Sequence, residues 1–209
     1  MSAATPSETT GTLFVVSAPS GAGKTSLVKA LIDSRPNLNV SISHTTRKMR
    51  PGEVDGVDYH FVSKEEFKEI EAGGGFLEYA NVFDNFYGTS RKFVEDGLRN
   101  AGNVMLEIDW QGAAQVKLNK PNAVSIFILP PSLEVLEQRL RRRNQDSDES
   151  IERRLRDALT DIAQCKNFDY IVMNDDFDAA IMDMKTIFHV TDLHRDKQLE
   201  QYGRLFGLD

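Results

Sequence analysis

The chain has 209 residues, of which 40% are hydrophobic and 27% are charged. This mixture is typical of a folded globular protein and excludes a collagen, a coiled coil and a wholly disordered chain. The formal net charge of -7 argues against a general binder of nucleic acid or anionic membranes, so any polyanion has to meet a local basic patch.

Strand-like and helix-like segments alternate along the chain from residue 12. Short apolar runs, typical of buried strands, lie at 13–16, 104–108, 124–129 and 170–173. Apolar residues with helical spacing lie at 25–33, 90–99, 111–119, 132–143, 150–165 and 178–190, and a surface helix is expected within 192–209. Because strands that alternate with helices pair in parallel, the pattern predicts an α/β fold with a parallel sheet flanked by helices.

Two regions interrupt this alternation. Residues 41–90 consist of short polar and aromatic pieces with turn signals, which predicts a small inserted subdomain of mixed structure. Residues 139–156 carry seven of the 25 Lys and Arg residues, an unusual density for an acidic protein.

The most informative motif follows the first predicted strand and opens the first predicted helix. A glycine-rich turn in that position directs backbone N–H groups at a phosphate, and the helix N-terminus adds positive potential. The lysine can reach the β- and γ-phosphates, and the hydroxyl after it can bind magnesium. We therefore predict an ATP site at this turn, formed by Ser20, Gly21, Ala22, Gly23, Lys24, Thr25 and Ser26. Ala18 stands where the usual pattern has glycine, so its φ must be negative.

Two acidic residues lie at the end of the predicted strand 104–108. Glu107 or Asp109 suits a magnesium ion, through water, alongside Thr25. An aspartate in this position is equally typical of a helix cap. The spacing alone leaves both readings open.

The arginine-rich region has a functional and a structural interpretation. Arg139 and Arg143 are four residues apart, on one face of a helix, and Arg154 lies on the next helical segment. Guanidinium groups suit the charge that spreads over a transferred phosphoryl group. In an acidic protein with a phosphate-binding turn, this interpretation is favoured over a solvated basic face.

The insert contains two further candidates. Arg47 and Arg50, with Tyr59, are suited to a second phosphate, although the loop taken alone is only polar. Glu78 lies among apolar residues and can accept hydrogen bonds from a base. Without further information, an exposed glutamate on an edge strand is the favoured interpretation of Glu78.

Several strings together resemble the guanylate kinase family in its bacterial form. They occupy residues 17–25, 44–53, 76–78, 87–90, 108–112 and 174–176. They follow the order and spacing of that family over roughly residues 12 to 190, and the Thr-Thr-Arg-x-x-Arg-x-Gly-Glu string at 45–53 is highly specific to it.

The resemblance implies a P-loop core with a nucleotide-binding insert and a lid, and transfer of phosphate from ATP to GMP, and to dGMP, with Mg²⁺. By position, Ser43, Glu78 and Asp109 would contact guanine, with Thr89 at the base. The GMP phosphate would be held by Arg47, Arg50, Tyr59 and Tyr87, with Glu53 supporting the arginines. With Lys24, the lid arginines Arg139, Arg143 and Arg154 would act on the ATP phosphates, and Asn174 would lie beside the adenine.

The implied organisation is one guanylate-kinase-like domain. Residues 1–11 would be a disordered tail, the core would comprise 12–40, 91–136 and 158–209, the insert 41–90, and the lid 137–157. The single cysteine, Cys165, cannot form an internal disulfide, and the N-terminus shows no export signal, so a cytoplasmic location is expected.

Two other functions stay open at this point. A guanylate-kinase-like domain can be a catalytically inactive protein-binding module, but such modules usually have a damaged phosphate loop, and this loop is intact. A P-loop kinase for another acceptor, such as AMP, is the second alternative, and the acceptor string at 45–53 argues against it. Neither nucleic acid nor membrane is expected as a partner, and the sequence leaves open whether the chain forms a homodimer or a higher oligomer.

Overall fold

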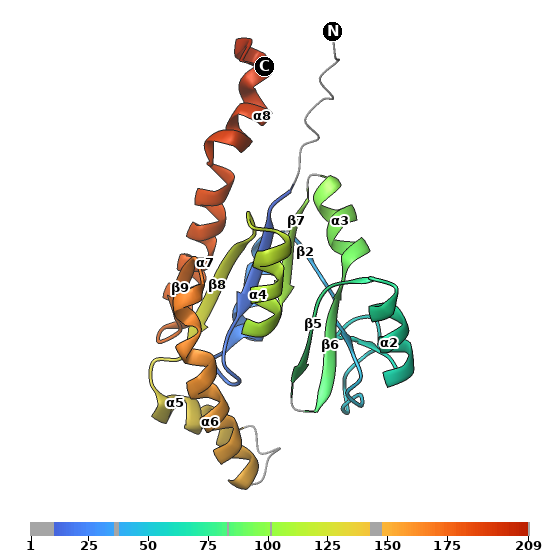
Figure 1. Cartoon of the computed structure of the whole chain (residues 1–209). Helices are drawn as coiled ribbons and strands as arrows, with labels where there is room; N and C mark the ends of the chain where they lie inside the picture. Colours follow the sequence, from blue (N-terminus) through green and yellow to red (C-terminus); the bar gives the residue numbers. More distant parts are fainter. Residues whose placement is uncertain (1–10, 36–37, 83, 101, 143–147, 209) are drawn as a thin grey trace.

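A computed structural model describes residues 11–35, 38–82, 84–100, 102–142 and 148–208. Its core is a sheet of five strands in the order β2-β7-β1-β8-β9, and every neighbouring pair is parallel. The strands are β1 (Leu13–Ser17), β2 (Leu38–Val40), β7 (Asn103–Glu107), β8 (Val124–Leu129) and β9 (Tyr170–Met173). The predicted α/β fold is confirmed, and helices flank this sheet in Figure 1.

Strand β1 is apolar throughout because it is buried on both faces. Phe14 and Val16 pack with α1 (Lys24–Ser34) and α7 (Phe177–Asp192), whereas Leu13 and Val15 pack towards α3 (Arg91–Arg99) and α4 (Trp110–Asn119). Alternate side chains of a strand point to opposite faces, so a run of four apolar residues supplies both layers. The buried run predicted at 13–16 therefore lies at the centre of the core.

A second sheet forms within the insert. Its order is β4-β3-β6-β5, built from β3 (His44–Thr45), β4 (His60–Phe61), β5 (Phe76–Val82) and β6 (Asn85–Ser90). The β3–β4 pair is parallel, and the other pairs are antiparallel. Helix α2 (Lys64–Ala72) begins at a capping box formed by Ser63 and Glu66 and packs Phe67 against this sheet. In Figure 1 the insert lies beside the core sheet.

The remaining helices follow β8. They are α5 (Leu133–Arg142), α6 (Asp148–Ala163) and α8 (Arg195–Phe206), with a short 3-10 turn at Cys165–Asn167. Helices α5 and α6 pack through their own small apolar cluster, which includes Leu136, Leu140 and Ile151. They lie at the opposite end of the molecule from α8 in Figure 1. The predicted helices agree with the observed ones to within about two residues at their ends.

Several elements of the fold were not predicted from the sequence, among them helix α2 within the insert. Strand β2 has only three residues, and one of them is Asn39, so it shows no apolar run. Strands β3 and β4 have two residues each and depend on their neighbours for pairing. Such short strands leave no periodic pattern, and their formation is decided by tertiary contacts.

Replacing Phe188 with alanine is expected to destabilise the core strongly. Its side chain is fully buried and stacks on Phe14, with ring centroids 3.7 Å apart. Truncation of such an aromatic residue costs about 3–5 kcal/mol of unfolding free energy, which urea titration measures. Leu118, which is 83% exposed, is the control, and its replacement with alanine should cost less than about 0.5 kcal/mol. Equal effects of the two substitutions would contradict the central place of Phe188.

Candidate functional site

The phosphate loop connects β1 to α1 through two glycines with left-handed backbone. Gly21 has φ 91° and Gly23 has φ 97°, conformations that L side chains rarely adopt. A Cβ on Gly23 would also lie 2.3 Å from Nδ2 of Asn174, so this glycine is required sterically as well. Ala18 is not among the residues with positive φ, as its side chain requires.

Lys24 begins α1 at the base of this loop and lies in an acidic environment. Burial lowers the pKa of Lys24, and the nearby carboxylates of Glu107, Asp109 and Glu78 oppose that shift. Burial likewise raises the pKa of both Glu107 and Asp109, and Lys24 opposes it. One cation and three carboxylates, drawn from α1, β7, the start of α4 and β5, therefore share one partly desolvated site.

Asp109 is a helix cap in this structure. Its Oδ1 accepts a hydrogen bond of 2.9 Å from the backbone N–H of Gly112 in the first turn of α4. The structure confirms the helix-cap interpretation of Asp109, and its role towards magnesium stays a prediction. Its other carboxylate oxygen, Oδ2, accepts a hydrogen bond of 3.2 Å from Nε2 of Gln111. A capping aspartate can still present a carboxylate to a ligand.

Glu78 is buried, contrary to the interpretation favoured from its sequence context. It belongs to the edge strand β5, yet its exposed fraction is only 3%. Its Oε1 accepts a hydrogen bond of 2.5 Å from Oγ1 of Thr89, which is itself fully buried. Burial is the main reason that the pKa of Glu78 rises to about 7, and Thr89 and Lys24 act against this rise.

A second cluster lies in the insert and is centred on Arg47. Its guanidinium forms a bidentate ion pair with the Glu53 carboxylate, with N–O distances of 2.7 and 3.0 Å. Its Cζ lies 5.2 Å from the ring centroid of Tyr59, and the Tyr59 and Tyr87 rings are 6.0 Å apart. The hydrogen bonding of the Arg47 guanidinium to the Glu53 carboxylate is the main reason that the pKa of Arg47 is raised. This arrangement holds a guanidinium and two phenols close together, as an anion site requires.

Glu53 also organises the loop around Arg50. The backbone N–H of Arg50 donates to Oε2 of Glu53 over 2.7 Å, while the Arg50 side chain is exposed. The two clusters are electrostatically connected, because Glu107 is among the groups that raise the pKa of Tyr59, after burial and Tyr87. Ser43 is half-buried, and its carbonyl accepts a hydrogen bond from the backbone N–H of His60.

Arg139 and Asn174 both contact the phosphate loop directly. Nη1 of Arg139 and Nδ2 of Asn174 donate to the carbonyl of Ala22 over 3.2 and 2.7 Å, and Nη2 of Arg139 donates to the carbonyl of Asn174 over 3.2 Å. Arg154 is half-buried on α6, and Arg143 lies outside the described residues. Of the two predicted lid arginines that the structure describes, Arg139 contacts the loop.

The residues around Lys24 suit a hard cation that is also bound by phosphate. The hydroxyl of Thr25 and the carboxylates of Glu107 and Asp109 are oxygen donors, which Mg²⁺ prefers. Within the part of the chain that the structure describes, no group of three or more His, Cys, Asp and Glu residues can enclose a metal. A magnesium ion held by one or two protein groups together with phosphates fits such a donor set.

Sequence reasoning missed three polar residues of α4 that fasten it to neighbouring elements. Gln115 accepts from the backbone N–H of Tyr79 and donates to its carbonyl, and Asn119 donates to the carbonyl of Leu77. The indole N–H of Trp110 donates to Asp161 on α6 over 3.0 Å, and burial raises the pKa of Asp161 to about 6. The i, i+4 spacing of Gln115 and Asn119 was the one available signal for a shared helix face.

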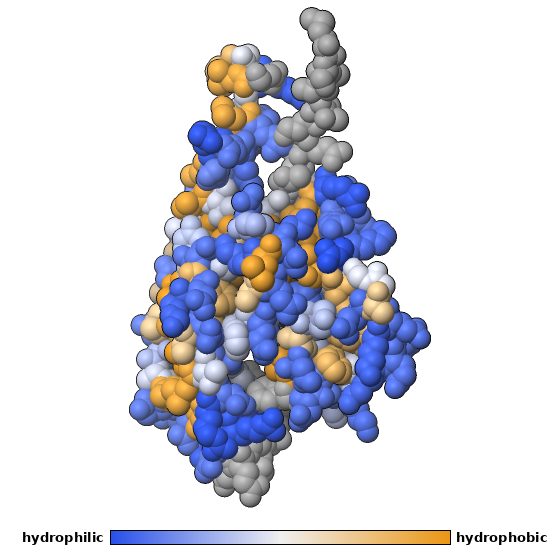
Figure 2. All heavy atoms as spheres, in the orientation of Figure 1, coloured by the Kyte–Doolittle hydropathy of each residue, from blue (hydrophilic) through white to orange (hydrophobic). Residues whose placement is uncertain are grey.

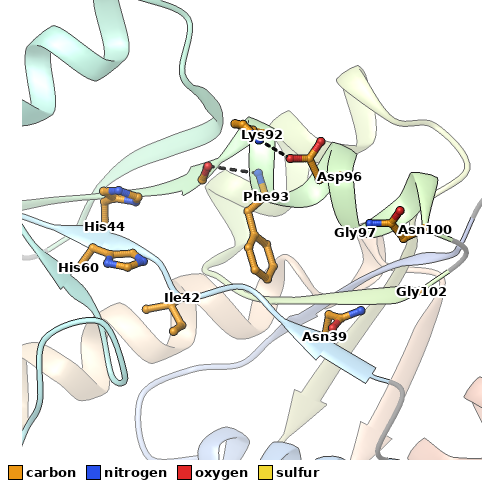
Figure 3. A pocket seen from close by; sticks show the side chains of 11 residues that line it. Asn39, Ile42, His44, His60, Lys92, Phe93, Asp96, Gly97, Asn100 and Gly102 are labelled. Carbon is orange, nitrogen blue, oxygen red and sulfur yellow. Dashed lines mark hydrogen bonds and ion pairs between the residues drawn. The ribbon is translucent and has the colours of Figure 1, made fainter.

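A separate cavity of about 570 Å³ lies between the insert and α3. Figure 3 shows the ring of Phe93 directed towards Ile42, with His44 and His60 side by side at one end. His44 and Ser90 line this cavity, whereas their chain neighbours Ser43 and Thr89 do not. Successive residues of extended chain face opposite ways, so the cavity and the candidate site lie on opposite faces of the insert.

Comparison with known proteins identifies the family. The family model described as guanylate kinase matches residues 10–191. The guanylate kinase of Pseudomonas fluorescens (strain Pf0-1) is 54% identical over 198 residues, covering 95% of this chain and 96% of that protein. The guanylate kinase of Vibrio cholerae is 54% identical over 199 residues, which cover 94% of this chain and 96% of that protein. The crystal structure of guanylate kinase from Anaplasma phagocytophilum matches with a TM-score of 0.76 and 33% identity, over 90% of this chain and 89% of that chain. The chain belongs to the guanylate kinase family.

Proposed function

We propose that this chain transfers the γ-phosphoryl group of ATP to GMP, and to dGMP, giving ADP and the corresponding diphosphate. The observation that carries the proposal is the pairing of two anion-binding clusters. One is the glycine loop with Lys24, and the other is Arg47 with Tyr59 and Tyr87. Glu107 is among the charged groups that act on the pKa of both Lys24 and Tyr59, which supports placing the two clusters near each other.

On the donor side, the loop residues bind the ATP phosphates. Backbone N–H groups at the start of α1 point at the phosphates, and Lys24 supplies a fixed cation. Arg139 donates to the loop carbonyl of Ala22, and we assign Arg143 and Arg154 to act with it on the ATP phosphates. Asn174, whose side chain braces Ala22, lies beside the adenine.

On the acceptor side, Arg47, Arg50, Tyr59 and Tyr87 hold the GMP phosphate. The Glu53 carboxylate orients both arginines. It accepts hydrogen bonds from the side chain of Arg47 and from the backbone N–H of Arg50. Glu78, Ser43 and Asp109 read the guanine edge, with Thr89 holding Glu78. A buried carboxylate accepts the N–H donors of guanine, whereas adenine leaves it without matching donors.

The reaction needs no strong base, because the phosphate of GMP is already an anionic nucleophile. One of its oxygens forms a bond to the γ-phosphorus of ATP as the bond from that phosphorus to the ADP oxygen breaks. The chain's contribution is to place these groups in line and to complement the spreading negative charge. Thr25, with Glu107 or Asp109 through water, would hold Mg²⁺, which neutralises phosphate charge when bound.

The cellular location and the assembly state belong to the same proposal. A cytoplasmic location agrees with the single cysteine of the sequence. None of the helices in the described part of the chain is long and apolar enough to span a membrane. We place self-association at the end of α8 and just after it, where Leu205, Phe206 and Leu208 are more than half exposed and apolar atoms gather in Figure 2. That end of the molecule is opposite α5 and α6, so association there leaves the site open.

Replacing Lys24 with methionine should nearly abolish turnover and leave the fold intact. The variant keeps much of the side-chain volume and removes the cation. Loss of one preorganised charge at such a site costs about 10²–10³ in rate. A coupled assay of ADP release with ATP and GMP measures kcat, and circular dichroism checks the fold. A kcat close to that of the wild type would exclude the role assigned to Lys24.

Replacing Glu78 with glutamine should weaken the choice of guanine over adenine. The amide keeps the size of the side chain but carries no charge and pairs only partly with the N–H groups of guanine. The kcat/KM for GMP should fall by about 10²-fold, because charge-assisted hydrogen bonds are roughly twice as strong as neutral ones. The kcat/KM for AMP should hold or rise. If the ratio of the two values stays at its wild-type level, Glu78 does not read the base.

The KM for GMP should depend on pH through the same carboxyl. Glu78 has a pKa of about 7 in the free protein, and only its ionised form accepts both hydrogen bonds. Below that pH the carboxyl must release a proton when GMP binds, so the KM rises by about tenfold per pH unit. The phosphate of GMP also titrates, near pH 6 by analogy with other phosphate monoesters.

The Glu78→Gln variant is the matched control for this pH profile. It keeps the titration of the GMP phosphate and removes that of residue 78. The ratio of wild-type KM to variant KM therefore isolates Glu78, and it should increase as the pH falls below 7. A ratio that is constant between pH 5.5 and 8 would contradict the assignment.

A further inference from the structure

The position of Glu78 is not explained by its own strand. The pairing of β5 with β6 shifts register between Phe76 and Glu78, so Leu77 is an extra residue at this point. Phe76, Leu77 and Glu78 are all buried, and the shift places Glu78 on the face that a regular strand would give to the residue before it. A bulge of this kind turns a side chain to a new direction. Here it directs Glu78 away from solvent and towards α4.

One face of α4 fixes the backbone on both sides of Glu78. Gln115 forms two hydrogen bonds to the backbone of Tyr79, with distances of 3.2 and 2.7 Å. Asn119 donates to the carbonyl of Leu77 over 3.1 Å. Gly112 lies one turn earlier on this face, since residues three and four apart are neighbours on a helix.

Gly112 leaves the space that the Glu78 carboxylate occupies. A Cβ at residue 112 would lie 2.3 Å from Oε2 and 3.0 Å from Cδ of Glu78. The φ of Gly112 is not positive, so its backbone conformation is open to alanine. Alanine is also the better helix former. Glycine is therefore needed at residue 112 because a side chain there would collide with the Glu78 carboxylate, and not because the backbone conformation requires glycine.

We propose that Gly112 is a specificity-determining positioning residue, which sets the depth at which Glu78 presents its carboxylate to the guanine base. It makes no contact of its own with the substrate and acts through Glu78. The inference rests on the proposed function, in which Glu78 reads guanine.

The variant that tests the proposal is Gly112→Ala. The added methyl displaces Oε2 of Glu78, and a misplacement of about 1 Å can cost on the order of 10²-fold in activity. We expect kcat/KM for GMP to fall by at least about tenfold through KM, with the KM for ATP changing less than about twofold. The ratio of kcat/KM for GMP to that for AMP should fall with it. A merely structural role would change both substrates together.

Gly203→Ala is the matched control. Gly203 also lies within a helix, α8, and a Cβ there would meet Leu208 atoms no closer than 3.7 Å, an ordinary contact. This variant should keep the wild-type kinetic constants. Its melting temperature shows what an alanine in a helix does when no carboxylate is displaced.

A double-mutant cycle with Glu78→Ala decides whether Gly112 acts through Glu78. In the Glu78→Ala background there is no carboxylate to displace, so Gly112→Ala should have no further effect on kcat/KM for GMP. An equal loss in both backgrounds, or no loss in either, would overturn the proposal. If Gly112→Ala alone does not fold, the double variant should fold like Glu78→Ala, and its failure to do so would also overturn it.

Wild-type turnover of GMP, measured first, separates the two claims. Its absence would contradict the proposed function. If the wild type turns over GMP and the Gly112→Ala variant has the same kinetic constants, only the role of Gly112 is contradicted.

Discussion

The site depends on one buried electrostatic balance, that between Lys24 and the carboxylates of Glu78, Glu107 and Asp109. Burial raises the pKa of each of the three carboxyl groups, and the Asp109 carboxylate adds to the rise at Glu78. Lys24 lowers the cost of keeping them charged, and they in turn oppose the loss of its own proton. Because Lys24 acts on the pKa of all three carboxyl groups and they act on its own, these side chains behave as a unit.

The fold places this group with elements that are rigid for other reasons. Lys24 follows a strand that is buried on both faces, and Glu107 ends the neighbouring parallel strand. Asp109 caps α4, and Glu78 comes from a bulge that α4 holds in place. The carboxyl ends of adjacent parallel strands meet at one edge of a sheet, which is where ligands bind in open α/β folds. The charges are therefore positioned by strand pairing, core packing and hydrogen bonds to the backbone, and not by their mutual attraction.

Most of the core was predictable from the sequence, because its strands are continuous apolar runs. The phosphate loop was equally clear, since Gly21, Gly23 and Lys24 lie between a strand and a helix. The burial of Glu78 was not predictable. It depends on a bulge at Leu77 and on contacts with Gln115 and Asn119, which lie 36 or more residues away along the chain. Neither leaves a local pattern, whereas a glutamate in an edge strand ordinarily indicates exposure.

Arg139 shows how the structure and the proposed chemistry fit together. Its guanidinium spans the loop carbonyl of Ala22 and the carbonyl of Asn174, so the loop and the segment after β9 are joined by one side chain. A guanidinium carries five N–H donors, and these two hydrogen bonds use one donor on each terminal nitrogen. Enough donors are left for a phosphate oxygen at the loop. An arginine already fixed to the loop loses less conformational freedom when it binds phosphate than a solvated one would. The contacts that α5 makes with the loop therefore prepare Arg139 for the phosphate role assigned to it.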